Sequence, residues 1–272
     1  MLYKTPEHPV TVTMVPISPH ASPSFVDVRR RFGFRTIEMG RWVTPVERDR
    51  AAAAFYRALC DLMTALSVPE VVISLRGQLS LQYGKGGQLG VNAHYMPATQ
   101  QLALAKNAGA GSLAHEWFHA FDHYIADKAF ANLKPQQFAS SAWFDQKPGK
   151  AHPLNDRLTD CFRAIFSDDG GAASPLVANA MLADRLNNRL YYALPEELCA
   201  RAFEAFAEDC GPGNRFLVHG TRKSDEAQAG LYPTGQQRQR INDTFTVYFR
   251  ALGLAVRHQS VHSEKDTALA RW

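Results

Sequence analysis

Two histidines and one glutamate form an HExxH pattern at His115, Glu116 and His119. On an α-helix, residues four apart lie one turn apart and about 40° apart around the axis, so both imidazoles can bind one ion. Zinc accepts histidine ligands in this arrangement. Glu116 points about 100° away from His115, which suits a carboxylate that does not bind the metal. The spacing therefore predicts Zn²⁺ as cofactor, with Glu116 as the general base that deprotonates water in a hydrolysis reaction.

Catalytic zinc commonly takes a third protein ligand, and three acidic residues are candidates for a place near it. Glu197 and Glu204 share one face of a second expected helix, so either can supply a ligand by its pattern. Asp122 lies on the same side of its helix as His115 and His119, where it is better suited to hold a ligand imidazole than to bind the metal.

The histidines need a rigid helix, and the surrounding sequence predicts one. Leu113, Trp117, Phe121 and Tyr124 recur at helical spacing, which predicts a helix from Ser112 to about Phe130 with the histidines on a different face. Further expected helices cover 44–66, starting at a Thr44 cap, and then 176–190, 195–209 and 236–252. Residues 133–175 are expected to be rich in loops.

Short strands are expected before the histidine helix. They cover 71–75, 79–83, 93–96 and 101–106, the last two as a hairpin, and another is expected at 10–15. Strands and helices do not alternate regularly, so the fold class is α+β, with a small mixed or antiparallel sheet and a mostly helical C-terminal half. We expect an extended arm over 1–25, one metallopeptidase domain over 26–257 and a polar tail over 258–272. Strand 101–106 or its hairpin partner would pair with the backbone of a peptide.

The composition excludes several other classes of protein. The chain has 272 residues and a net charge of +4, with its basic residues scattered, which argues against a nucleic-acid partner. It has no apolar run long enough for a membrane span or a signal peptide, so we expect a cytoplasmic protein without a membrane partner. The cysteines are far apart, which predicts reduced thiols; they are Cys60, Cys161, Cys199 and Cys210.

The segments His115–Asp122 and Glu197–Phe203 resemble the catalytic domain of anthrax lethal factor, a gluzincin. That family has HExxHxxD followed by a glutamate that opens a second helix. The resemblance implies Glu197 as the third zinc ligand and Tyr191 or Tyr192 as the tyrosine that stabilises the oxyanion. It also implies a zincin-like fold. Leu198 stands where the family has an aromatic residue.

A longer resemblance is to the CLCA_X family and to the metallopeptidase-like domain of large polyvalent proteins from phages and conjugative elements. It covers roughly residues 26–255. The matching stretches outside the two helices are 31–38, 40–43, 80–84, 93–95 and 104–111. This resemblance implies a peptidase that acts on a peptide or protein substrate.

Two functions of different classes follow from the same residues. The first is a zinc metallopeptidase in which His115, His119 and Glu197 hold the metal. The alternative is a non-hydrolytic, zinc-stabilised interaction module associated with mobile-element or phage proteins. Glu116 favours the peptidase, because a purely structural zinc site does not need a general base.

Overall fold

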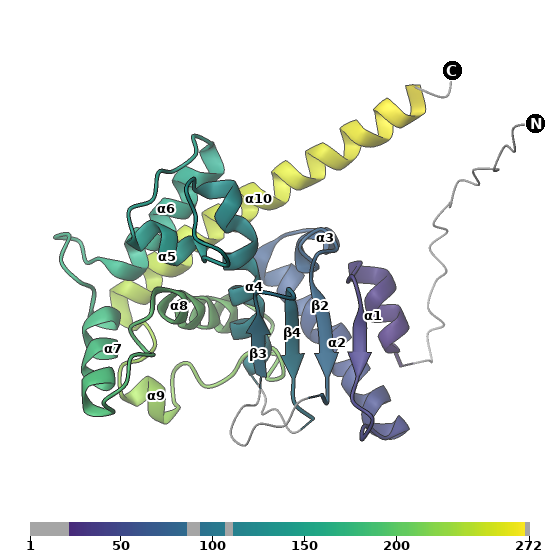
Figure 1. Cartoon of the computed structure of the whole chain (residues 1–272), viewed down its shortest axis with the longest axis horizontal. Coiled ribbons are helices and arrows are strands. Elements are labelled where there is room, and N and C mark those ends of the chain that lie inside the picture. The colour runs from purple at the N-terminus through teal and green to yellow at the C-terminus, as the bar shows by residue number, and fades with distance from the viewer. Residues whose placement is uncertain (1–21, 86–92, 107–110, 270–272) are drawn as a thin grey trace, which may run out of the picture.

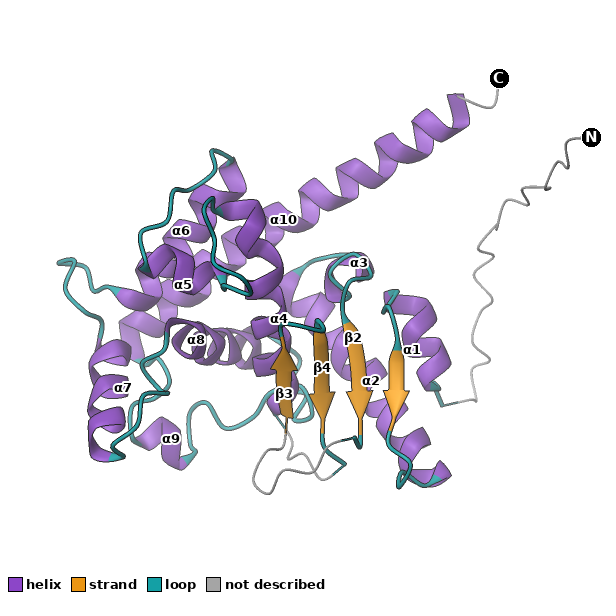
Figure 2. Ribbon diagram, viewed as in Figure 1, coloured by secondary structure: helices purple, strands orange, loops and turns teal. Residues whose placement is uncertain are grey.

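The structure is a computed structural model that describes residues 22–85, 93–106 and 111–269. The described residues form ten helices and four short strands (Figure 2). The predicted α+β fold class is confirmed. The strand expected at 10–15 lies outside the described residues.

The four strands form one mixed sheet with the order β1-β2-β4-β3 (Figure 1). Their bounds are β1 Ile37–Met39, β2 Ser80–Tyr83, β3 Ala93–Met96 and β4 Gln101–Leu104. Strands β1, β2 and β4 are parallel, whereas β3 runs antiparallel to β4 with Tyr95 opposite Leu102. The predicted hairpin is confirmed, and its first strand, β3, is an outer strand of the sheet.

Helices make up most of the remaining described chain. In chain order they are α1 Phe25–Phe32, α2 Pro45–Leu66, α3 Glu70–Ile73, α4 Ser112–Ala129, α5 Ala139–Phe144, α6 Pro153–Phe166, α7 Pro175–Leu186, α8 Pro195–Cys210, α9 Asp225–Gln228 and α10 Gly235–Leu269. Helix α2 begins with the predicted cap: Thr44 accepts a hydrogen bond from the Glu47 amide, and the Glu47 carboxylate accepts one from the Thr44 amide. None of these helices has the length and apolarity needed to cross a membrane.

One predicted strand is wrong. Residues 71–75 contain β-branched side chains that favour a strand, yet Glu70–Ile73 form helix α3 after Pro69. Leu75 and Arg76 then adopt φ values of 53° and 57°. This left-handed turn cannot continue a strand, and it leads the chain directly into β2.

The segment 133–175, which we expected to be rich in loops, contains two helices. Pro153 does not interrupt this part of the chain, because it occupies the first turn of α6, where a proline needs no amide partner. Leu158, Cys161, Phe162 and Ile165 follow at helical spacing and are buried. The helical spacing of these apolar residues is therefore a better predictor of structure here than the loop-like composition of the segments around them.

The last helix is longer than the sequence pattern predicted. The expected range was 236–252, whereas α10 continues to Leu269 and its distal part extends away from the rest of the protein (Figure 1). Residues 253–269 contain a single glycine and no proline after the expected end, so the backbone has no strong signal to stop.

An aromatic core fixes α4 against α8. Phe118 on α4 stacks on Phe203 of α8, with the ring centroids 4.8 Å apart, and Trp117 lies 5.5 Å from the same ring. Phe249 of α10 lies 5.8 Å from Phe203 and closes the cluster. This packing sets the position of the histidine helix relative to the helix that carries the acidic candidates. The four cysteines are free, as predicted.

Candidate metal centre

The structure brings together three of the residues that the sequence singled out. His115 and His119 come from α4, and Glu197 comes from the first turn of α8. The Nε2 atoms of the two histidines lie 3.0 Å apart. Oxygens of Glu197 lie 3.4 Å from Nε2 of His115 and 3.3 Å from Nε2 of His119. One nitrogen or oxygen from each residue therefore converges on a small volume that can hold a metal ion.

The spacing of these atoms fits a tetrahedral zinc ion. Ligand atoms at about 2.0–2.2 Å from such an ion lie roughly 3.3–3.6 Å from one another. The two Nε2 atoms are 3.0 Å apart, and each has one Glu197 oxygen at a distance near this range: Oε2 lies 3.4 Å from His115 and Oε1 lies 3.3 Å from His119. In addition, Oε2 of Glu197 is buried and has no hydrogen-bond partner among the described residues. The Arg201 guanidinium lies 3.6 Å from this oxygen, beyond hydrogen-bond distance, so the oxygen remains available to a metal ion.

Glu204 approaches the other side of the His115 ring. Its Oε2 lies 2.9 Å from Nδ1 of His115. A carboxylate only accepts hydrogen bonds, so Nδ1 carries a proton; once a metal ion displaces the proton on Nε2, that nitrogen presents its lone pair to the cluster. Glu204 is thus placed to orient His115, while Glu197 faces the ligand nitrogens. These distances distinguish the roles of Glu197 and Glu204, which the helical pattern alone could not distinguish.

The cluster has an electrostatic field that favours a cation. Burial opposes a charge on His115, but the carboxylates of Glu204 and Glu197 outweigh it and raise the pKa of His115 to about 10. Burial also opposes the charge on Glu197, yet hydrogen bonds and charges from the two histidines hold its pKa well below the usual range. The same field that retains a proton attracts a divalent ion, which must displace that proton on binding.

Glu116 lies beside the cluster. It is 8% exposed. Burial is the main cause that raises its pKa, and the Glu197 carboxylate adds to the effect, whereas the two histidines and the Tyr95 amide lower it. A buried carboxylate with a raised pKa is a better proton acceptor at neutral pH than an ordinary one. Because the Tyr95 amide is close enough to lower the pKa of Glu116, the outer strand β3 lies next to this carboxylate.

The two candidate tyrosines differ in their surroundings. Burial raises the pKa of Tyr191, and the Glu197 carboxylate raises it further, which places the Tyr191 phenol near that carboxylate. Tyr192 instead packs partly against the hydrophobic core, and its carbonyl accepts a hydrogen bond from Arg201. The Tyr191 hydroxyl therefore lies next to a residue of the cluster.

Asp122 is fully buried but engages a different partner from the one expected. Its carboxylate accepts hydrogen bonds from the amide and the hydroxyl of Ser140. These contacts fix the start of α5 against α4. Burial raises the pKa of Asp122 to about 6 despite these bonds. Within the described part of the chain, Nδ1 of His119 has no hydrogen-bond partner, so Asp122 does not bind that imidazole here.

Two large side chains next to the cluster residues pack into the core. Phe118, which directly precedes His119, is buried and stacks on Phe203. Leu198 is fully buried next to Glu197. Both side chains therefore stabilise the α4–α8 contact and do not separate His115, His119 and Glu197 from one another.

The sequence did not single out Arg201 or Tyr232. Arg201 is one helical turn after Glu197, is 4% exposed and lies 3.6 Å from the Glu197 carboxylate. Tyr232 donates a hydrogen bond of 3.2 Å to Oε2 of Glu204. The spacing of Glu197 and Arg201 is a signal that could have identified the first pair. No local pattern connects Tyr232 with Glu204.

Comparison with protein families identifies part of the chain. Residues 183–256 match the model of the large polyvalent protein-associated domain 1. This match ties the chain to large polyvalent proteins, in agreement with that part of the expected resemblance. The matched region contains Glu197 and Glu204 but begins well after the two histidines, and it does not identify a peptidase. No curated protein and no solved structure matches the chain significantly.

Proposed function

We propose that this protein is a zinc-dependent peptidase of the gluzincin type, with His115, His119 and Glu197 as the residues that hold the metal. The convergence of the two imidazole Nε2 atoms with the Glu197 carboxylate carries this proposal. Histidine nitrogen and carboxylate oxygen form a donor set that suits zinc. The metal, when bound, would acidify water and polarise the scissile carbonyl.

The remaining residues support peptide hydrolysis. Glu116 would accept the proton of the attacking water and pass it to the leaving amine, as a buried carboxylate with a raised pKa can. Tyr191 would donate its phenolic hydrogen to the oxyanion that forms from the carbonyl. Strand β3 is an outer strand of the described sheet beside α4, so its outer edge could pair with an extended peptide next to Glu116. A sheet with such a strand beside the histidine helix supports a zincin-like fold.

The proposal is tested by digestion of a complex peptide mixture. We expect the zinc-loaded protein to create new peptide termini, detected by mass spectrometry. Removal of zinc with 1,10-phenanthroline should abolish the cleavage, and added zinc should restore it. If the zinc-loaded protein leaves the mixture intact, the peptidase proposal is wrong and the alternative, a zinc-stabilised interaction module, replaces it.

A further inference from the structure

Residues 214–234, here called the crossing segment, lie between α8 and α10 in the chain and contact both α4 and α8, the helices that carry the metal centre. At its start, the Leu217 carbonyl accepts a 3.0 Å hydrogen bond from the Ala114 amide, one residue before His115. Gly111 has φ of 107°, and a Cβ atom there would lie 3.0 Å from the His219 amide nitrogen. The segment thus packs closely against the first turn of α4.

At its other end, the crossing segment contacts Glu204. Oε2 of Glu204 accepts hydrogen bonds from both Nδ1 of His115 and the hydroxyl of Tyr232. Two donors on one oxygen fix the position of the carboxylate more firmly than one. Tyr232 is therefore the third member of a chain that runs from the segment to a residue of the metal centre.

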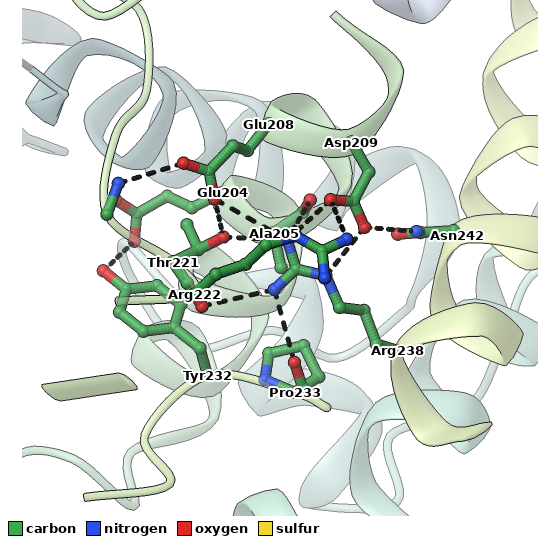
Figure 3. A network of polar contacts seen from close by, with 11 residues as sticks. Glu204, Ala205, Glu208, Asp209, Thr221, Arg222, Tyr232, Pro233, Arg238 and Asn242 are labelled. Carbon is green, nitrogen blue, oxygen red and sulfur yellow. Dashed lines mark hydrogen bonds and ion pairs between the residues drawn. The ribbon is translucent and has the colours of Figure 1, made fainter. Parts of the chain in front are cut away.

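A buried arginine holds the segment in place (Figure 3). Arg238 of α10 is 5% exposed and forms a two-pronged ion pair with Asp209 of α8, at 2.7 and 2.8 Å. It also donates to the carbonyls of Thr221 and Pro233, at 3.2 and 3.4 Å. Pro233 directly follows Tyr232, so Arg238 fixes the backbone next to that tyrosine.

The last turns of α8 complete this anchor. Glu208 accepts hydrogen bonds from the Gly220 amide and the Thr221 hydroxyl. The Asp209 carboxylate also accepts one from Asn242. Burial opposes the charge on Asp209, but its hydrogen bonds, first that to Arg238, lower its pKa to about 2. The anchor is therefore charged at neutral pH and holds both ends of the Thr221–Pro233 stretch.

We propose that Tyr232 is a positioning residue for the metal centre, and that docking of the crossing segment and metal binding stabilise each other. The inference rests on the metal-binding part of the proposed function. Tyr232 acts through Glu204 and His115 and does not touch the metal. Because coupling between two binding events is reciprocal, metal should also hold the segment in its docked position.

The test compares Tyr232→Phe with Tyr56→Phe. Each change removes one phenolic hydroxyl, and the hydroxyl of Tyr56, on α2, accepts a hydrogen bond from Arg31 of α1 and not from a residue of the metal centre. Loss of an outer partner of a metal ligand typically weakens affinity by about 10–100-fold. Tyr232 is one bond further out, so we expect Tyr232→Phe to weaken zinc affinity by roughly three- to tenfold in chelator competition. Tyr56→Phe should bind zinc like the unmodified protein.

Two further readouts separate positioning from general stability. Cobalt absorption should change in Tyr232→Phe and not in Tyr56→Phe, because only the first alters the orientation of His115. Arg222 and Lys223 are exposed trypsin sites in the crossing segment. Zinc should slow cleavage there in the unmodified protein and in Tyr56→Phe, and slow it less in Tyr232→Phe.

These measurements do not depend on peptide hydrolysis. If Tyr232→Phe matches the unmodified protein in zinc affinity and cobalt spectrum, the inference is wrong while the peptidase proposal is unaffected. If both effects occur in a protein that cleaves no peptide, the inference holds and the peptidase proposal is wrong. If the unmodified protein binds no metal, both are overturned.

Discussion

Glu116→Gln should retain zinc and the fold but lose peptide hydrolysis by about 10²-fold or more. The amide has nearly the shape of the carboxylate but cannot accept a proton. Glu116 is also not among the residues whose atoms converge on the metal position. The measurement is kcat on a peptide identified from the digestion experiment, together with zinc content and thermal unfolding of the same preparation.

The control for this variant is Glu70→Gln, which makes the same chemical change at the partly exposed start of α3, where Glu70 pairs with Arg31. We expect unchanged hydrolysis there. Undiminished kcat in Glu116→Gln would show that Glu116 is not the base. Loss of zinc in that variant would instead make Glu116 a metal ligand and contradict the geometry of α4.

Glu197→Ala should weaken zinc affinity by at least about a hundredfold, because loss of an outer partner alone already costs about 10–100-fold. Glu204→Ala should weaken it less. The difference follows from position: Glu197 faces the Nε2 atoms of both histidines, whereas Glu204 binds Nδ1 of His115. Chelator competition on both variants measures the two losses on one scale.

Glu196→Ala is the matched control, since Glu196 precedes Glu197 in the same helical turn and binds Ser141. It should leave zinc affinity unchanged. A larger loss in Glu204→Ala than in Glu197→Ala would exchange the roles of the two glutamates. Equal affinity in Glu197→Ala and the unmodified protein would remove Glu197 from the metal centre.

The sequence was most informative where helical periodicity determines position. The four-residue spacing of His115 and His119 sufficed to predict that they share a side of α4, because that relation is internal to one helix. Glu197 and Glu204 also share a face of α8, so periodicity alone could not distinguish them. The distinction depends on how α8 packs on α4 through Phe118 and Phe203.

Contacts that depend on irregular segments could not be predicted in this way. Tyr232 reaches Glu204 from an irregular segment that Arg238 holds against α8 through the carbonyls of Thr221 and Pro233. The same limitation explains the strand predicted at 71–75. Its β-branched residues favour a strand locally, but in the structure they form the short helix α3. A left-handed turn at Leu75 and Arg76 then follows, before β2 begins.

Elemental analysis of the purified protein tests the central claim most directly. The protein should be prepared without chelator, and a metal-free sample should be reloaded with zinc and freed of excess. We predict about one zinc ion per chain in the unmodified protein, and little in a His115→Ala, His119→Ala double variant that is still folded. Less than about 0.2 zinc per unmodified chain after reloading would contradict the metal centre and, with it, the proposed peptidase.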